Sequence, residues 1–170
     1  MITVEINDAQ VRQALDEVAR ALTDLTPAMQ DIGEYLTETT KERFREGVSP
    51  EGTPWAPKSQ ATIDAYVARK DKVDFRPLHG PSGRLSSEIA YQVGPSQVEI
   101  GSSLVYAAVQ QFGAEAGQFG ARIGTDKRGR SYFMPIPWGD IPARPFLGLS
   151  AEDRTGVLEI LEEYVTGAQE

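Results

Sequence analysis

The sequence contains no cysteine, and its one histidine is His79. The absence of cysteine excludes disulfide bonds, thiolate catalysis and thiolate metal sites, and it suits folding in a reducing cytosol. A lone histidine also excludes a metal site with two histidine ligands. No apolar run approaches the roughly 20 residues of a membrane-spanning helix. The opening stretch MITVEIND lacks the basic start and apolar core of a signal peptide.

The composition is that of a globular protein. The chain has 170 residues, of which 40% are hydrophobic and 25% charged, and this length predicts a single domain over 1–170. The net charge of −8 argues against sequence-independent DNA binding, which depends on basic side chains that neutralise phosphates.

The first third of the chain predicts a short strand and two helices. Residues 2–6 alternate apolar and polar side chains, as in a half-buried strand. Apolar residues then recur at helical spacing from Val11 to Leu25. Thr26 and Pro27 predict the cap and first residue of a second helix, which ends at Gly47. The apolar stripe of this helix comprises Met29, Ile32, Leu36 and Phe44.

The middle of the chain alternates loops with short elements. Residues 49–62 form a Pro/Gly-rich loop in which Ser59 caps a short helix. An exposed, mobile connection leads to two strands over 87–93 and 97–102, joined by a Gly-Pro-Ser turn. A turn or short helix ends at Gly113.

The last third predicts a loop, a strand and a terminal helix. The glycine-rich residues 114–130 read as a long flexible loop, and 131–138 as an edge strand. Ser150 and Asp153 approximate a capping box. The apolar face expected for the terminal helix comprises Val157, Leu158, Leu161 and Val165.

Helices and strands are segregated along the chain, which predicts an α+β fold. N-terminal helices would pack on a small, mainly antiparallel sheet, with a C-terminal helix and long flexible loops. The helical part spans about 8–70, the sheet part about 83–140 and the terminal helix about 151–166.

No pattern indicates catalysis, a cofactor or a metal. His79 with a nearby serine would need triad geometry, and no nucleophile elbow or phosphate-binding loop occurs; a solvated loop histidine is the plainer reading. The glutamates of the terminal helix fit a solvent-facing side, and the basic cluster at 127–130 fits a hairpin tip better than a phosphate site. The serines near His79, the basic cluster and the glutamates of the terminal helix are Ser82, Ser86, Ser87, Lys127, Arg128, Arg130, Glu159, Glu162 and Glu163.

Four segments, at 49–62, 83–93, 98–113 and 141–154, together resemble the virion morphogenesis family of tailed bacteriophages, found in Mu-like and P2-like phages. The resemblance lies in their order and spans about 40–165. The matching residues are Phe44, Gly52, Trp55, Gly83, Arg84, Leu85, Tyr106, Ala107, Phe112, Gly113, Pro142, Arg144, Pro145, Phe146, Leu147 and Gly148. Many relatives carry histidine where this chain has Gln110 and Gln111, and glutamine suits a hydrogen-bonding structural role.

Several matched residues are candidates for subunit contacts or for anchoring loops. Trp55 either locks its loop to a helix or anchors a partner. Arg84 pairs with an acid of the same chain or of a neighbour. Pro145 restricts Arg144 to extended geometry, so Arg144 either meets a carboxylate on a neighbouring subunit or forms an Arg–acid pair that holds the terminal helix. Core positions are expected for Leu85, Tyr106, Phe112, Phe146 and Leu147.

The resemblance implies a non-enzymatic structural protein of the virion tail or neck, assembled in the host cytoplasm, that takes part in tail completion at the head–tail junction. It implies a homo-oligomeric ring, a hexamer or dodecamer, which contacts neighbouring neck, connector and tail proteins and lets DNA pass through its lumen without specific binding. No cofactor and no membrane is implied. The alternatives are a transient morphogenesis factor absent from the mature virion, a tail terminator or head-closure ring, and a small hydrolase or nucleic-acid-processing enzyme.

Overall fold

The structure is a computed structural model that describes residues 13, 19, 24–126 and 128–167. The strand expected at 2–6 lies outside these residues, as does nearly all of the helix expected before Leu25. The elements, in chain order, are α2 (Thr26–Glu46), α3 (Gln60–Arg69), α4 (Arg84–Ser87), β1 (Ile89–Gly94), β2 (Gln97–Ser102), α5 (Ala107–Phe112), β3 (Ala121–Thr125), β4 (Ser131–Pro135) and α6 (Ala151–Gly167). None of the described helices is long and apolar enough to cross a membrane.

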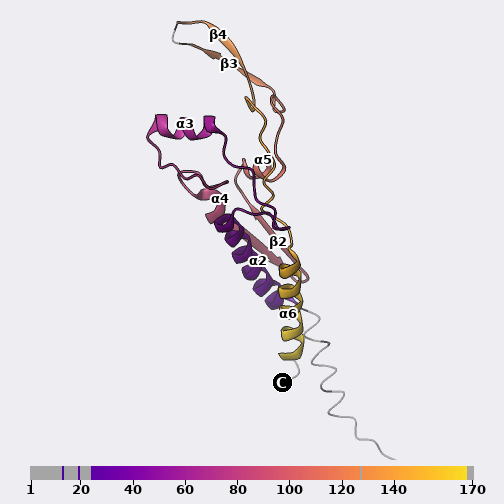
Figure 1. Ribbon diagram of the computed structural model, residues 1–170. Helices are drawn as coiled ribbons and strands as arrows, with labels where there is room; N and C mark the ends of the chain where they lie inside the picture. Colours follow the sequence, from indigo (N-terminus) through magenta and orange to yellow (C-terminus); the bar gives the residue numbers. More distant parts are fainter. Residues whose placement is uncertain (1–12, 14–18, 20–23, 127, 168–170) are drawn as a thin grey trace, which may run out of the picture.

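The α+β prediction is confirmed, with two small antiparallel hairpins in place of one sheet. β1 pairs with β2 from Ile89↔Ser102 to Gly94↔Gln97, and this hairpin packs on α2. α6 packs on α2 as well, so α2 is the central element of the lower part of the molecule (Figure 1).

The sequence of α2 accounts for its position. Met29, Ile32 and Leu36 recur at helical spacing and form a core with side chains of α6 and β2. Gly47 ends the helix in the left-handed conformation, at a φ of 78°. Thr26 was expected to cap the helix, but the cap position is Leu25 and Thr26 is the first helical residue.

Close approach between α2 and β1 depends on a glycine. The ring of Tyr91 covers Gly33, and a Cβ on Gly33 would lie 2.3 Å from the Tyr91 ring. The Tyr91 hydroxyl also donates to Glu34 at 3.2 Å. Gly33 therefore lets an aromatic ring from the hairpin rest directly on the helix backbone.

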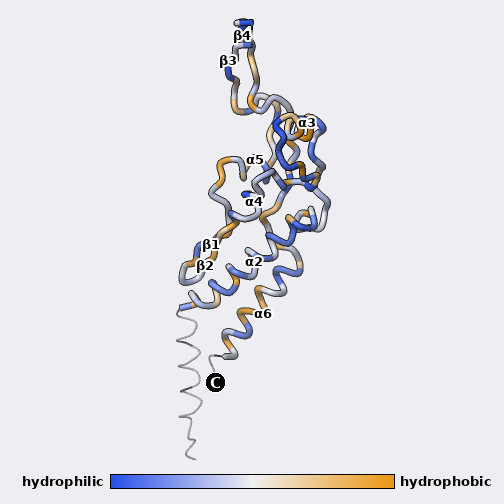
Figure 2. Tube along the Cα trace, turned by 90° about the vertical axis from the view of Figure 1, so that its left-hand side faces the viewer, coloured by the Kyte–Doolittle hydropathy of each residue, from blue (hydrophilic) through white to orange (hydrophobic). Residues whose placement is uncertain are grey.

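The expected long loop at 114–130 is wrong, because much of it forms a second hairpin. β3 pairs with β4, and Ile123 lies directly opposite Phe133. The tip is built by Asp126, whose Oδ1 accepts from the backbone N–H groups of Arg128 and Arg130 at 2.8 and 3.0 Å. Arg128 and Arg130 of the basic cluster thus lie at a hairpin tip, as expected, and the hairpin projects away from α2 and α6 (Figure 1 and Figure 2).

The terminal helix begins as predicted but differs on its apolar face. The Ser150 hydroxyl accepts from the Asp153 N–H at 2.9 Å, while the Asp153 carboxylate accepts from the Ser150 N–H at 2.7 Å, which is a capping box. Val157 and Leu161 pack against α2, together with Ile160. Leu158 is 59% exposed, so its expected place in the core is wrong.

Candidate functional site

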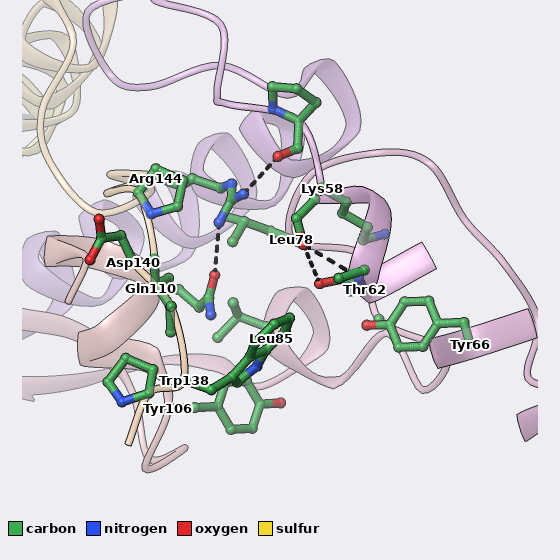
Figure 3. A pocket seen from close by; sticks show the side chains of 18 of the residues that line it. Lys58, Thr62, Tyr66, Leu78, Leu85, Tyr106, Gln110, Trp138, Asp140 and Arg144 are labelled. Atoms are coloured by element: carbon green, nitrogen blue, oxygen red, sulfur yellow. Dashed lines mark hydrogen bonds between the residues drawn. The ribbon is translucent and has the colours of Figure 1, made fainter. Parts of the chain in front are cut away.

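The segment around Arg144 joins three distant parts of the chain. Arg144 is 7% exposed, and its Nε and Nη2 donate to the carbonyls of Ala56 and Pro57 at 2.7 and 2.9 Å. Figure 3 shows the guanidinium pointing toward the 54–57 loop and toward Gln110. Burial lowers the pKa of Arg144 from its ordinary value, yet an arginine stays protonated. The cation is thus held by carbonyl dipoles, and no carboxylate pairs with it among the described residues.

Two neighbouring glutamines complete this junction. Arg144 donates to Gln110 through its backbone N–H, at 2.8 Å to the Gln110 carbonyl, and through Nη1, at 3.4 Å to Oε1. The side chain of Gln111 accepts from the N–H groups of Phe146 and Leu147 at 2.9 and 3.0 Å, and donates to the Leu147 carbonyl at 3.0 Å. The structural role expected for the two glutamines is confirmed.

Trp55 attaches the Pro/Gly-rich loop to the same segment. Its Nε1 donates to the Pro145 carbonyl at 2.7 Å, and its ring lies edge-on to Phe44 with 5.4 Å between centroids. The ring of Phe44 also packs against that of Phe146, with 5.3 Å between the two centroids. These residues, with Leu85, form one core cluster against which Leu147 packs half-buried. Inside the chain, Trp55 therefore holds its loop to α2 and to the 142–147 segment.

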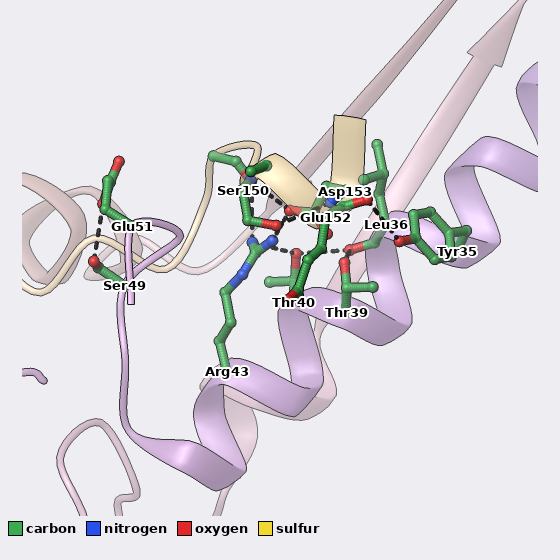
Figure 4. A network of polar contacts seen from close by, with 12 residues as sticks. Tyr35, Leu36, Thr39, Thr40, Arg43, Ser49, Glu51, Ser150, Glu152 and Asp153 are labelled. Atoms are coloured by element: carbon green, nitrogen blue, oxygen red, sulfur yellow. Dashed lines mark hydrogen bonds and ion pairs between the residues drawn. The ribbon is translucent and has the colours of Figure 1, made fainter. Parts of the chain in front are cut away.

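An arginine–carboxylate pair does hold the terminal helix, but its arginine is Arg43. Arg43 on α2 forms a buried ion pair with Asp153 of α6, and its Nη1 donates to the carbonyls of Phe146 and Gly148 (Figure 4). Burial alone would raise the pKa of Asp153, but hydrogen bonds from Ser150 and the charge of Arg43 keep it below its ordinary value. Sequence reasoning missed this pair, although a basic residue on the apolar side of α2 was a visible signal.

A groove lies between the α3 region and the 137–144 segment, with a volume of about 740 Å³. Figure 3 shows Tyr66, Leu78, Leu85, Tyr106 and Trp138 around it. Its apolar lining also includes Pro57, Ala61, Pro137, Ile141 and Pro142. All four sequence segments that carry the family resemblance contribute to this groove or its floor, so the motifs converge in space.

Three cations border the groove, and each is engaged within the chain. The Nζ of Lys58 donates to the carbonyls of Asp74 and His79, and burial lowers the pKa of this lysine. Arg84 pairs with Glu88 one helical turn away, which makes its partner an acid of the same chain. Arg144 is held by carbonyls as described above.

The expected core positions of Tyr106 and Phe112 are wrong. Tyr106 is 45% exposed and Phe112 78% exposed, because α5 is only six residues long and buries mainly Ala107. Both aromatic rings therefore remain at the surface, Tyr106 on the rim of the groove.

The described residues offer no metal-binding cluster of three or more His, Asp or Glu side chains. His79 is half-buried, not solvated as expected: its ring lies edge-on to Phe44 at 6.3 Å, and Nδ1 is 3.2 Å from the Pro77 carbonyl. This places the histidine beside the core cluster, in a packing role.

Comparisons with known proteins agree with the motifs. A family model described as the phage virion morphogenesis family matches residues 6–166. The chain is similar to the Mu-like prophage FluMu G protein 2 of Haemophilus influenzae, with 28% identity over 165 residues that cover 96% of each chain. It is also similar to the putative capsid assembly protein G of Escherichia phage Mu, with 28% identity over 167 residues, covering 95% of this chain and 90% of the relative. No solved structure matches significantly.

Proposed function

The chain belongs to the phage virion morphogenesis family, and from this premise we propose that it is a structural protein of the phage neck. In this role it completes the tail and joins it to the head, as a ring around the DNA channel. The name of the phage Mu relative, putative capsid assembly protein G, supports a part in building the particle.

The observation that carries the proposal is the amount of large apolar surface left uncovered. Side chains exposed by more than half include Val105, Phe112, Phe119, Ile123, Phe133 and Trp138. They lie on α5, in the turn before it, and on the hairpin and its root, where the described chain supplies few neighbours. Apolar surface of this extent on a small protein marks a contact with other protein.

A ring suits these surfaces. Heterologous contacts use two different patches on each subunit, and they close into a ring when the rotation between subunits permits. We propose a hexamer or dodecamer, by the family resemblance. The net charge of −8 would let DNA pass an acidic lumen without adhering to it.

The role is structural and not catalytic in this proposal. The polar groups at the centre of the motif junction bind backbone carbonyls and amides of the same chain. Groups engaged in this way hold loops in position, which supports a structural role.

A second candidate is a factor that acts during assembly and then leaves. The word "assembly" in the name of the phage Mu relative favours it, since that word does not require presence in the finished particle. Tail-terminator and head-closure rings remain variants of the first candidate.

Deletion of the gene for this protein in a phage that carries it distinguishes the neck protein from the transient assembly factor. The proposal predicts DNA-filled heads lying apart from full-length tails in electron micrographs of the lysate. It also predicts that mass spectrometry of wild-type particles finds the protein at the copy number of one ring, six or twelve subunits per particle. Separated parts without the protein in mature particles would establish the transient factor, and normally joined particles would refute both.

A further inference from the structure

The hairpin of β3 and β4, with its root, forms an arm that spans residues 114–141. Ala114 pairs with Ile141 at the base, and β3 and β4 make their main contacts with each other. A lone two-stranded hairpin is marginally stable in water and gains independent stability from packing against a further element. Among the residues that the structure describes, the hairpin therefore lacks the support that it needs.

The two faces of the hairpin differ. On one face, the ring of Tyr132 covers Gly124, where a Cβ would lie 2.5 Å from that ring. On the other face, Ile123 and Phe133 lie directly opposite each other and are 77% and 76% exposed. Cross-strand apolar pairs of this kind stabilise a sheet when they are covered. No described residue of the chain thus covers the apolar Ile123–Phe133 face.

The charge of the hairpin opposes that of the rest of the chain. Residues 121–135 contain four basic side chains and one acidic one, a net charge of +3, which leaves −11 on the remainder of a chain with −8 in total. Two hairpins would repel each other, whereas a hairpin and the body of a second copy attract. The charge distribution therefore favours contact between the hairpin and the body; over the whole arm, 114–141, Glu115 and Asp140 reduce the net charge to +1.

The body offers an apolar recess of suitable size. The groove of about 740 Å³ is lined by Tyr66 and Leu78 of the body and by Trp138 from the root of the arm, and its volume falls within the ~300–1,000 Å³ range of pockets that enclose a small molecule. Its neighbouring cations are already bound to carbonyls or to Glu88, so apolar side chains can enter without breaking an ion pair to a partner.

We propose that the arm of one copy lays Ile123 and Phe133 into the groove of a second copy of this chain. Each copy then gives one arm and receives one, which is the heterologous contact that a ring requires. The inference rests on the proposed ring and specifies the contact that builds it. The occupant of the groove is the neighbouring subunit's arm.

A first test measures self-association of the purified full-length chain by analytical ultracentrifugation over a range of concentrations. Phe133→Asp should weaken association by about tenfold or more, as expected for a buried aromatic anchor. The matched control is Phe75→Asp, since Phe75 is 71% exposed and lies outside the arm and the groove lining; it should leave association unchanged. A wild-type chain that stays monomeric, or equal effects of the two variants, would overturn the proposal.

A second test uses the absence of native cysteine, which removes background disulfides. Phe133→Cys on the arm and Ala61→Cys on the groove lining should crosslink when the two single variants are mixed and oxidised, and neither should crosslink by itself. Phe133→Cys mixed with Thr155→Cys, on α6, is the control and should give no product. Crosslinking of Phe133→Cys with itself would show contact between arms and refute the groove as receptor.

The double variant Ala61→Cys/Phe133→Cys should give a ladder of covalent oligomers that ends at the ring size. An electrophoretic shift assay with duplex DNA tests the other use of the arm. DNA binding by the wild-type chain that is lost in Arg128→Ala/Arg130→Ala, together with unchanged self-association of Phe133→Asp, would instead assign the arm to DNA. In phage, Phe133→Asp should fail to complement the deletion. Complementation by Phe133→Asp would refute the arm contact without affecting the proposed neck role, whereas a gene deletion without effect would refute the neck role.

Discussion

Arg43 and Asp153 lie 110 positions apart in the chain, yet they form a buried ion pair that fixes the start of α6 to the last turn of α2. Asp153 serves two purposes at once, because its carboxylate also accepts the Ser150 N–H of the capping box. One carboxylate therefore both caps the terminal helix and ties its first turn to α2, while Val157, Ile160 and Leu161 pack further along the same interface.

Removal of one partner of the buried pair should destabilise the fold strongly. Arg43→Met leaves Asp153 buried without its cation and is expected to lower the free energy of unfolding by about 3–5 kcal/mol, measured by urea denaturation. Arg45→Met removes an exposed arginine of the same helix, paired with Glu38 and Glu42, and should change stability by about 1 kcal/mol or less. Equal losses in the two variants would contradict the importance of burial.

The stability of the chain should fall in acid partly because of Asp153. Its pKa is lowered in the folded state, so the folded chain releases this proton more readily than the unfolded chain does. The stabilisation is present above the unfolded pKa of about 3.9 and is lost as the pH falls through the lower folded value. Asp153→Asn should be less stable at neutral pH and show a shallower decline between about pH 5 and 2. A parallel decline in both chains would assign the acid sensitivity to other carboxyls.

Loss of the Gln111 side chain should loosen the 142–147 segment. Gln111→Ala leaves the N–H groups of Phe146 and Leu147 without their acceptor, and an unsatisfied buried donor costs about 1–3 kcal/mol. Gln92→Ala, at an exposed position of β1, is the control and should be nearly neutral. Thermal unfolding of the two variants gives the comparison; a neutral Gln111→Ala would show that water replaces the side chain.

The two tryptophans should report on different environments. Trp55 is 6% exposed and Trp138 69% exposed, so acrylamide should quench the fluorescence of Trp138 far more than that of Trp55. The single-tryptophan variants Trp138→Phe and Trp55→Phe separate the two signals. Trp55→Ala is expected to cost about 3–5 kcal/mol because it opens a cavity beside Phe44. Protection of Trp138 from quenching upon self-association would place it at a contact between subunits.

Substitution of Gly33 should destabilise the packing of α2 on β1. Gly33→Ala places a methyl group against the Tyr91 ring, and the resulting strain of about 1–3 kcal/mol outweighs the gain of about 1 kcal/mol from replacing glycine in a helix. The double variant Gly33→Ala/Tyr91→Ala should lose less than the sum of the two single changes, because the clash is gone. Gly101→Ala, at a position with open space, is the control; strict additivity would rule out the contact.

Local sequence patterns were sufficient for most elements. The helix ending at Gly47, the cap at Ser59, the first hairpin and the capping box at Ser150 were predicted because each depends on residues only a few positions apart. The second hairpin was missed because Gly117, Gly120 and Gly124 recur in β3 and just before it, and glycine normally indicates a loop. In the structure, the Tyr132 ring occupies the space left by the missing side chain of Gly124.

The candidate site was predicted in part. The motifs around Trp55, Gln111 and Arg144 were recognised, and they do meet in space. Their partners were not, since Arg144 binds the carbonyls of Ala56 and Pro57 nearly ninety positions earlier. Carbonyl acceptors leave no mark on a sequence, because every residue carries one.

The sequence by itself determined the α+β class, the family and the segments that matter, because periodicity, caps and turn residues act over a few neighbouring positions. Only the tertiary structure decided which arginine meets the carboxylate of the terminal helix, and which aromatic side chains remain at the surface. Those outcomes depend on burial and on contacts between residues far apart in the chain, where competing partners of the same chemical type are separated by geometry alone.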